Sequence, residues 1–316
     1  MWLPRKAAPI LYRIIRRRGK GCLRLRDAVA PLFDRRCLTC LRARSASRVD
    51  RTGAFLRHWR HRAWGGMVRS SWLTFPQPRP RAALQLVCFP HAGGGASVFH
   101  PLAALLPPSI ALAAIQLPGR EARLGEPPFT RMAPLVSAMA DALAPALQQP
   151  TAFFGHSMGA LLAYELAREL VRRGEVPPVS LIVSGRRAPT FEGHEAPLHP
   201  LPDDAFVAEL VRRYDAIPQA ILAERELMAL FLPILKADFA VFETHRHADG
   251  APLPCPIGIY GGDADPQTAE MEGWAKLCAG PAKRRVFPGG HFYLVPQRQA
   301  LADALADDLG VLVDAG

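Results

Sequence analysis

The spacing of apolar residues changes repeatedly along the chain after residue 83. Short apolar runs, which are typical of buried strands, alternate with longer stretches in which apolar side chains recur every three or four positions, as on one face of a helix. The predicted strands are 84–89, 110–116, 151–154, 179–184, 255–261 and 284–287. The predicted helices are 99–106, 132–148, 161–173 and 297–313. This alternation predicts an α/β fold with a mostly parallel central sheet and helices on both faces.

The strand–helix alternation lapses over residues 190–247, which we call the helical insertion. Amphipathic helices fit 202–214 and 223–242, and Pro233 is expected to bend the second. An all-helical insertion at the C-terminal edge of a parallel sheet is a common position for a lid, whose apolar inner face would line a substrate channel. A surface insertion that packs on itself is the alternative, and the pattern leaves both open.

Charge is distributed unevenly along the 316 residues. Residues 1–66 hold 18 Arg and Lys against 3 Asp and Glu, whereas residues 67–316 hold 21 against 25. The overall excess of +11 therefore does not indicate that the main body of the chain binds nucleic acid. No apolar run approaches the roughly 20 residues of a membrane span, and no secretory signal is visible. Three widely spaced cysteines of the body are interpreted as buried, reduced thiols of a cytoplasmic protein. They are Cys88, Cys255 and Cys278.

The basic segment 1–66 has several interpretations. It could be a tail for nucleic acid or a membrane surface, or an organelle-targeting peptide. A zinc site is disfavoured because the spacing of its cysteine and histidine pairs fits no common finger. Those pairs are Cys37, Cys40, His58 and His61. The preferred hypothesis is a disordered segment read into the protein from a start site upstream of Met67, with the folded domain at 67–316.

A Gly-x-Ser-x-Gly sequence joins a predicted strand to a predicted helix. It reads Gly155-His156-Ser157-Met158-Gly159. In this context the serine stands on a strained turn that exposes its hydroxyl, and the flanking glycines make room for the turn. The N-terminus of the following helix would face a developing oxyanion. Ser157 is therefore the predicted nucleophile, and an ordinary glycine-rich turn is the alternative.

Two further residues complete a candidate catalytic triad. Asp265 and His291 follow Ser157 in the chain, each just beyond the end of a predicted strand. The order nucleophile, acid, histidine is typical of α/β-hydrolases. His291 can take the proton of the Ser157 hydroxyl, and a carboxylate must hold the imidazole in the right tautomer. Asp265 is preferred for that third role, because a Gly-x-x-Asp turn followed by Pro266 fits an acid loop that leaves a strand. Asp263 is closer to the strand end and could substitute, or it could be a carboxylate that caps local N–H groups.

The glycine-rich loop after the first predicted strand supplies the remaining candidates. Pro90-His91-Ala92-Gly93-Gly94-Gly95 lacks the spacing of the common phosphate-binding loops. In a serine hydrolase such a loop contributes an oxyanion-hole donor, and the N–H groups of Ala92 and Met158 are the predicted pair. His91 could be a catalytic base, but a residue that shapes the loop is preferred because His291 is better placed.

With these residues in place, the chain from about residue 72 resembles the type II thioesterases, stand-alone α/β-hydrolases that accompany nonribosomal peptide and polyketide synthases. The segments that carry the resemblance are Phe89-Pro90-His91-Ala92-Gly93-Gly94, Leu117-Pro118-Gly119-Arg120-Glu121, Gly155-His156-Ser157-Met158-Gly159-Ala160 and Phe287-Pro288-Gly289-Gly290-His291-Phe292-Tyr293. Each segment alone is a weak signal, whereas all of them in this order are specific. Residues 1–66 have no counterpart in that family.

The resemblance implies a function as well as a fold. Enzymes of this family hydrolyse acyl groups on the phosphopantetheine arm of carrier proteins and so restore stalled assembly lines. Ser157, Asp265 and His291 match the family's triad, Ala92 and Met158 match its oxyanion donors, and the helical insertion corresponds to its lid. The resemblance further implies a monomeric cytoplasmic enzyme without metal or cofactor, whose partner is an acyl or peptidyl carrier protein.

Other functions on the same fold stay open. A carboxylesterase or lipase would use the same residues on oxygen esters, and an acyltransferase would pass the acyl group to an alcohol or amine. A non-catalytic binding protein on a hydrolase scaffold belongs to a different class. The presence of serine, acid and histidine together argues against that last interpretation.

Overall fold

The computed structural model describes residues 70–147, 149–191, 193, 195–214 and 225–314. All of them belong to the unit Thr52–Gly316. The basic segment 1–66, with its candidate zinc ligands and the expected domain boundary at residue 67, lies outside the described residues.

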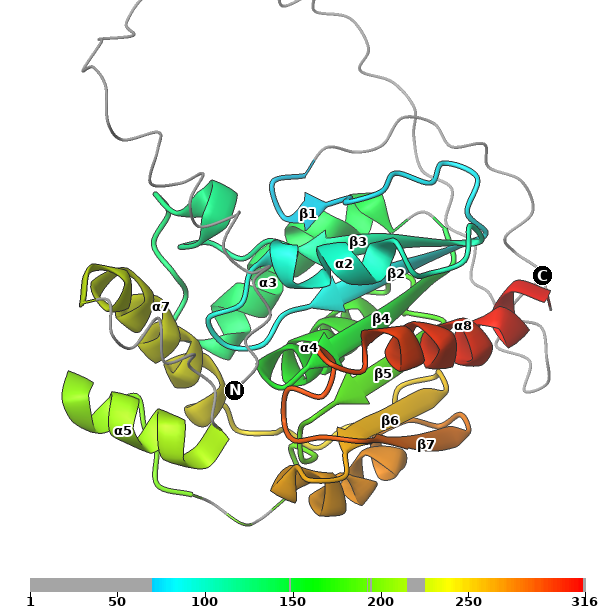
Figure 1. The fold of residues 1–316 in the computed structure, drawn as a ribbon. Helices are drawn as coiled ribbons and strands as arrows, with labels where there is room; N and C mark the ends of the chain where they lie inside the picture. Colours follow the sequence, from blue (N-terminus) through cyan, green and yellow to red (C-terminus); the bar gives the residue numbers. More distant parts are fainter. Residues whose placement is uncertain (1–69, 148, 192, 194, 215–224, 315–316) are drawn as a thin grey trace, which may run out of the picture. The chain divides into compact units, whose positions relative to one another are not determined.

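Seven strands of the described chain form one sheet (Figure 1), in the order β1-β3-β2-β4-β5-β6-β7. Their bounds are β1 Leu73–Thr74, β2 Leu84–Phe89, β3 Ile110–Ile115, β4 Thr151–His156, β5 Ser180–Ser184, β6 Ile257–Gly262 and β7 Ala282–Phe287. Every neighbouring pair is parallel except β1 with β3. The predicted mostly parallel sheet is confirmed. β1 was missed because a two-residue strand before a proline-rich stretch carries no periodic signal.

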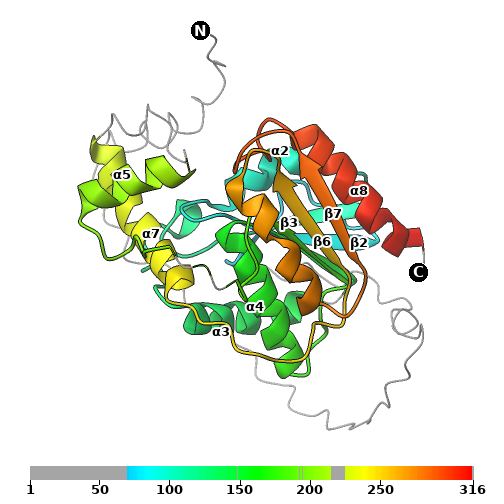
Figure 2. The ribbon, with the colours of Figure 1, turned by 90° about the horizontal axis from the view of Figure 1, so that it is seen from below.

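Helices cover both faces of the sheet, as predicted. One face packs on α3 (Met132–Leu143) and α4 (Met158–Arg172), and the other on α2 (His100–Ala103) and α8 (Arg298–Asp314). Figure 2 shows α3 and α4 on one side of the strands and α8 on the other. Because successive side chains of a strand point to opposite faces, Val87 joins the first core and Leu86 the second.

Two predicted helices are shorter in the structure. The stretch 132–148 is α-helical only to Leu143 and continues as the 3-10 turn Ala144–Ala146 (η4). Pro145 explains this, because proline has no N–H to donate to the helix. The stretch 99–106 is the 3-10 turn Ala96–Phe99 (η2) followed by the single turn of α2. The turns η3 Glu121–Arg123, η5 Pro266–Glu270 and η6 Glu272–Leu277 had no clear sequence signal.

The helical insertion holds α5 (Asp203–Tyr214) and α7 (Arg225–Glu243), with Pro233 inside α7. Both predicted helices are confirmed over these bounds, and residues 215–224 lie outside the described residues. The two helices lie side by side in Figures 1 and 2. Their contact has its own small core, in which the rings of Phe206 and Phe239 meet edge to face at 5.2 Å.

A buried ion pair joins the insertion to the rest of the fold. Asp238 of α7 receives two hydrogen bonds from Arg120, Nη1–Oδ2 at 2.5 Å and Nη2–Oδ1 at 2.8 Å. Its Oδ2 also accepts the backbone N–H of Gly93 at 2.7 Å. Both charged side chains are about 95% buried, with 5% and 4% exposure. The insertion therefore does more than pack on itself, because α7 is bonded to the glycine-rich loop.

The sequence led us to expect that the chain has no membrane-spanning segment and that its body cysteines are buried and reduced. Among the described residues, none of the helices combines the length and the apolar character that crossing a membrane requires. Cys88, Cys255 and Cys278 are buried and free, as expected from their apolar surroundings.

The ion pair generates a stability prediction. Asp238→Ala leaves the Arg120 guanidinium buried without a counter-charge and removes the acceptor of the Gly93 N–H. We expect a loss of about 3–5 kcal/mol in the free energy of unfolding, measured by urea denaturation. Glu272→Gln, which removes an exposed pair with Arg284, is the matched control and should leave the unfolding midpoint unchanged. A loss below about 1 kcal/mol for Asp238→Ala would contradict a buried Arg120 that depends on Asp238 for its counter-charge.

Candidate active site

Ser157 occupies a sharp turn between β4 and α4. Its backbone angles are φ 56° and ψ −117°, a conformation that residues with a side chain rarely adopt. Neighbouring backbone leaves space only for glycine on either side. A Cβ on Gly155 would lie 2.1 Å from the carbonyl oxygen of Gly159, and a Cβ on Gly159 would lie 2.1 Å from that of Phe89. The Ser157 N–H donates to the Ser184 carbonyl at 2.8 Å, which ties the turn to β5.

His291 is in direct contact with one of the two candidate carboxylates. Its Nδ1 lies 2.8 Å from Oδ2 of Asp265, and the two side chains are 7% and 2% exposed. The other oxygen of Asp265 accepts the N–H of Gln267 at 3.0 Å, so the carboxylate has a fixed orientation. Since Nδ1 carries the proton in this contact, Nε2 of a neutral His291 keeps a free lone pair.

Asp263 has a different environment. It is exposed, and its Oδ1 accepts the N–H of Gly289 at 2.8 Å. This bond links the loop after β6 to the loop that carries His291. Of the two candidate carboxylates, Asp265 contacts His291, and Asp263 bonds to the loop that carries His291.

The ends of four parallel strands bring these residues together at one edge of the sheet. His156 at the end of β4 pairs in register with Ser184 at the end of β5, and Gly262 of β6 pairs with Phe287 of β7. The ring of His156, the residue before Ser157, lies 5.1 Å from the ring of His291, centroid to centroid. The structure thus gathers the loops that hold Ser157, Asp265 and His291, as expected for the carboxyl edge of a parallel sheet.

The glycine-rich loop lies beside the turn that holds Ser157, since Gly159 approaches the Phe89 and Pro90 carbonyls. Two of its N–H groups are engaged: Gly93 donates to Asp238, and Gly94 donates to the His91 carbonyl at 2.9 Å. In the described part of the chain, no protein acceptor takes the N–H of Ala92 or of Met158. Both N–H groups are therefore available for an oxyanion.

His91 bonds within its own loop. Its Nδ1–H donates to the carbonyl oxygen of Ala92 at 2.9 Å, and its ring meets that of Phe292 at 5.1 Å. Burial lowers the pKa of His91 from its ordinary value. A neutral imidazole that holds a backbone carbonyl agrees with the interpretation of His91 as a residue that shapes the loop.

A buried polar chain behind the site was not anticipated. Nδ1 of His156 lies 2.9 Å from the Ser184 hydroxyl, which lies 2.7 Å from the Tyr293 hydroxyl. Burial is the main cause that lowers the pKa of His156 well below its ordinary value and raises that of Tyr293. The only sequence signal was proximity, because His156 adjoins Ser157 and Tyr293 follows His291 by two positions.

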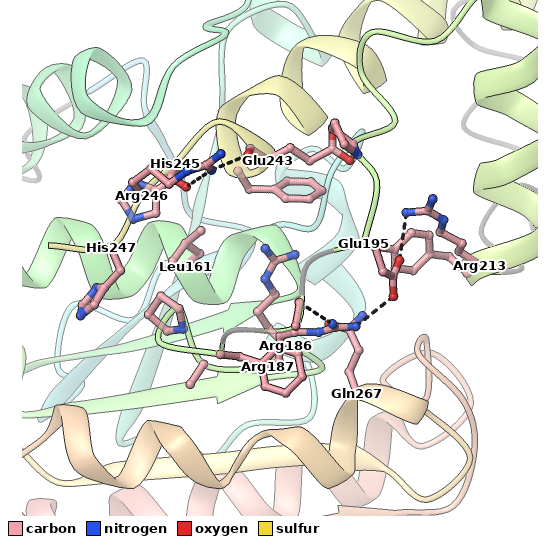
Figure 3. A pocket seen from close by; sticks show the side chains of 17 residues that line it. Leu161, Arg186, Arg187, Glu195, Arg213, Glu243, His245, Arg246, His247 and Gln267 are labelled. Atoms are coloured by element: carbon pink, nitrogen blue, oxygen red, sulfur yellow. Dashed lines mark hydrogen bonds and ion pairs between the residues drawn. The ribbon is translucent and has the colours of Figure 1, made fainter.

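A cavity adjoins these residues on the side of the helical insertion (Figure 3), with a volume of about 250 Å³. Tyr214 of α5 lines it, and the Tyr214 ring lies 5.4 Å from that of His291. The expected apolar channel wall is only partly correct. Phe242 and Leu161 are joined in the lining by four arginines, which are Arg186, Arg187, Arg213 and Arg246.

We searched the described residues for side chains that could bind a metal ion. Across the described residues, His, Cys, Asp and Glu side chains form no group of three or more that could hold an ion.

Comparison with known proteins identifies the family. A family model described as a thioesterase domain matches residues 84–309. The chain belongs to the thioesterase family. It is therefore an enzyme that hydrolyses thioesters, and the expected α/β-hydrolase fold is confirmed by the sheet and by solved relatives.

The relatives of this thioesterase include biosynthesis proteins and thioesterases of bacteria. It is 35% identical to the gramicidin S biosynthesis protein GrsT of Aneurinibacillus migulanus, over 77% of this chain and 96% of the relative. It is 39% identical to the thioesterase PikA5 of Streptomyces venezuelae, over 75% and 85%. The solved type II thioesterase BorB from the borrelidin biosynthetic cluster is 37% identical over 75% of this chain and 95% of BorB, with a TM-score of 0.66. The predicted resemblance to type II thioesterases is confirmed.

The buried state of His156 generates a pH prediction. Its pKa in the folded thioesterase lies below the ordinary value near 6.5, so the unfolded chain takes up the proton first as the pH falls. Stability is therefore complete above about pH 6.5 and decreases below it, by at most about 1.4 kcal/mol per pH unit for this one group. His156→Asn, which cannot titrate, should show a shallower decrease in urea unfolding between pH 7.5 and 5.5.

His91 also has a lowered pKa, and it is present in both the wild type and His156→Asn. Its contribution to the pH dependence of stability is therefore similar in both, and the difference between the two stability curves reports on His156. Parallel curves for the wild type and the variant would contradict a neutral, buried His156. An independent check is the ring ¹⁵N shift of His156, which should remain that of a neutral imidazole at pH 5.5.

Proposed function

We propose that this thioesterase hydrolyses acyl or aminoacyl thioesters on the phosphopantetheine arm of carrier proteins, and so clears misprimed or stalled nonribosomal peptide or polyketide assembly lines. The observation that carries the proposal is the contact between His291 and Asp265 beside the strained turn of Ser157. Support for the pathway type comes from solved relatives such as YbtT, a type II thioesterase from the yersiniabactin NRPS/PKS biosynthetic pathway, which is 29% identical to this chain.

The proposed reaction begins at Ser157. A hydroxyl is a weak nucleophile near pH 7, so His291 takes the proton through Nε2 as Ser157 Oγ attacks the thioester carbonyl. Asp265 holds the other ring nitrogen and stabilises the imidazolium that forms. The N–H groups of Ala92 and Met158 donate to the oxyanion, and the dipole of α4 acts in the same direction.

The second half of the proposed reaction releases the acid. The pantetheine thiol leaves with the proton of His291, and an acyl group remains on Ser157. Water then attacks the acyl-enzyme with His291 as the base. Because a thiolate is a better leaving group than an amine, this site needs less acid assistance than that of a peptidase. The proposed steps use no metal or cofactor.

The helical insertion is proposed to act as the lid that admits the arm. Its support is the bond between Asp238 of α7 and the glycine-rich loop, together with the contact of Tyr214 with the His291 ring. We further propose a monomeric cytoplasmic enzyme, for which the free, buried cysteines are the support.

The residue assignments predict a matched series of variants. Ser157→Ala should reduce kcat for thioester hydrolysis at least about 10³-fold without changing the unfolding midpoint, and His291→Ala should reduce kcat by a similar factor. His91→Ala should keep appreciable activity, because it removes a structural contact of the loop only. A loss with His91→Ala as deep as with His291→Ala would mean that the base is wrongly assigned.

The two aspartates provide the sharpest internal control. Asp265→Asn preserves the shape of the side chain but stabilises the wrong tautomer of His291, so we expect a loss of kcat of about 10³-fold or more. Asp263→Asn removes only a bond to the Gly289 N–H and should retain most of the activity. The reverse order of the two variants would overturn the assignment of the acid.

The substrate class is tested by one acyl group on two supports. Hydrolysis of the acyl group on a phosphopantetheinylated carrier protein is compared with that of a small oxygen ester, by kcat/KM. We expect a preference of at least about tenfold for the carrier-bound thioester, which corresponds to about 1.4 kcal/mol of transition-state binding. Equal or faster hydrolysis of the ester would leave the triad intact and identify a general esterase.

A further inference from the structure

The cavity beside the candidate active site has an unusual charge arrangement. Of its lining residues, Gln267 bonds through its N–H to Asp265, and Tyr214 contacts the His291 ring. A molecule in the cavity would therefore lie close to the reacting groups. Four arginines but only two glutamates, Glu195 and Glu243, line the space.

Both glutamates already have partners. Glu195 pairs with Arg187 at 3.1 Å and with Arg213 at 2.9 Å, as the dashed lines in Figure 3 show. Glu243 accepts the N–H groups of Leu198 at 2.8 Å and His199 at 2.9 Å. These bonds hold both carboxylates in place, and two glutamates against four arginines leave the lining with an excess of positive charge.

Three of the arginines have polar partners as well. Arg187 also reaches Glu270 at 3.2 Å, and Arg246 donates to the carbonyl oxygens of Glu243 and His245 at 3.0 and 2.9 Å. Arg186 differs from them. In the described part of the chain its guanidinium makes no hydrogen bond or ion pair, and its contact is with the face of the Phe242 ring, 4.5 Å from the centroid.

The position of Arg186 is well defined. It follows Gly185 directly after β5, and Trp274 donates its indole N–H to the Arg186 carbonyl at 2.7 Å. Figure 3 shows the side chain directed into the space between this loop and α7. Burial lowers the pKa of the guanidinium, yet arginine stays protonated in proteins. A partly buried cation that has no hydrogen-bonding partner among the described residues therefore faces the cavity.

We propose that Arg186 binds an oxyanion of the thioester substrate in this cavity, and that it makes the enzyme selective for substrates that carry one. The planar guanidinium matches the two oxygens of a carboxylate or a phosphate. Two parts of a substrate carry such a group: the far end of a dicarboxylic acyl chain, and the phosphate of the pantetheine arm. This inference rests on the proposed function, because it assumes that the thioester reaches Ser157.

Four substrates distinguish a carboxylate on the acyl chain from the phosphate of the pantetheine arm. Butyryl and succinyl groups have the same chain length and differ by a carboxylate, and each is placed on pantetheine and on 4′-phosphopantetheine. We measure kcat/KM for the wild type and for Arg186→Gln on all four. The variant should lose about tenfold or more on the substrates that carry the recognised oxyanion and less than about twofold on neutral butyryl-pantetheine.

The pattern identifies the ligand. A loss confined to the succinyl substrates assigns the site to the acyl carboxylate, and a loss confined to the phosphorylated pair assigns it to the arm. Arg186→Lys should recover part of the selectivity, because it keeps the charge but not the planar pair of donors. Arg187→Gln is the matched control, since its guanidinium is already paired with Glu195 and Glu270.

Two results would overturn the inference. An equal loss on all four substrates would show that Arg186 only supports the local structure, and no loss on any of them would show that it does not bind the anion. Binding of the corresponding amide analogues by calorimetry gives the same comparison without turnover. If the wild type hydrolyses none of the thioesters, the proposed function fails, while the calorimetric comparison still decides the role of Arg186.

Discussion

The close approach of backbones around Ser157 is the constraint on which the site depends. The Gly155 and Gly159 positions have no room for a side chain, because carbonyl oxygens lie where a Cβ would stand. This packing holds Ser157 at a positive φ that an isolated serine would avoid. The strain is therefore balanced by the surrounding sheet and helix. It places the hydroxyl beyond the end of β4 and lets α4 begin at the next residue.

The buried pair of Arg120 and Asp238 extends this organisation to the helical insertion. Removing two charges from water is costly, so such a pair adds little net stability compared with apolar residues. In this structure the pair fixes the position of α7 relative to the glycine-rich loop. Asp238 engages the Gly93 N–H, which leaves the Ala92 N–H as the available donor of that part of the loop. A movement of α7 would break the bond, so the position of the insertion and the shape of the loop are coupled.

The sequence predicted the parts of this structure that repeat or that follow a local rule. The parallel strands, α4 and both insertion helices carry clear periodicity, and the chain order of serine, acid and histidine located the site. It preferred Asp265 to Asp263 only by analogy with acid loops, because both residues follow the same strand and the directions of their side chains have no sequence signal. The hydrogen-bonded chain from His156 through Ser184 to Tyr293 joins the ends of β4 and β5 to the loop after β7, and such a long-range contact has no periodic signal. Arg186 was visible as a residue but not as an unpaired one, since pairing depends on where Glu195 and Glu243 lie.

Three histidine rings meet around the site. The ring of His156 lies 5.1 Å from that of His291 and 6.2 Å from that of His91. Burial keeps His156 and His91 neutral near pH 7, because it lowers the pKa of both. In the proposed mechanism His291 becomes an imidazolium as Ser157 attacks. Neutral neighbours add no repulsion to that charge, and the Asp265 carboxylate remains the nearest group that stabilises it. Of the three histidines, His291 is thus the one that gains a positive charge during the proposed reaction.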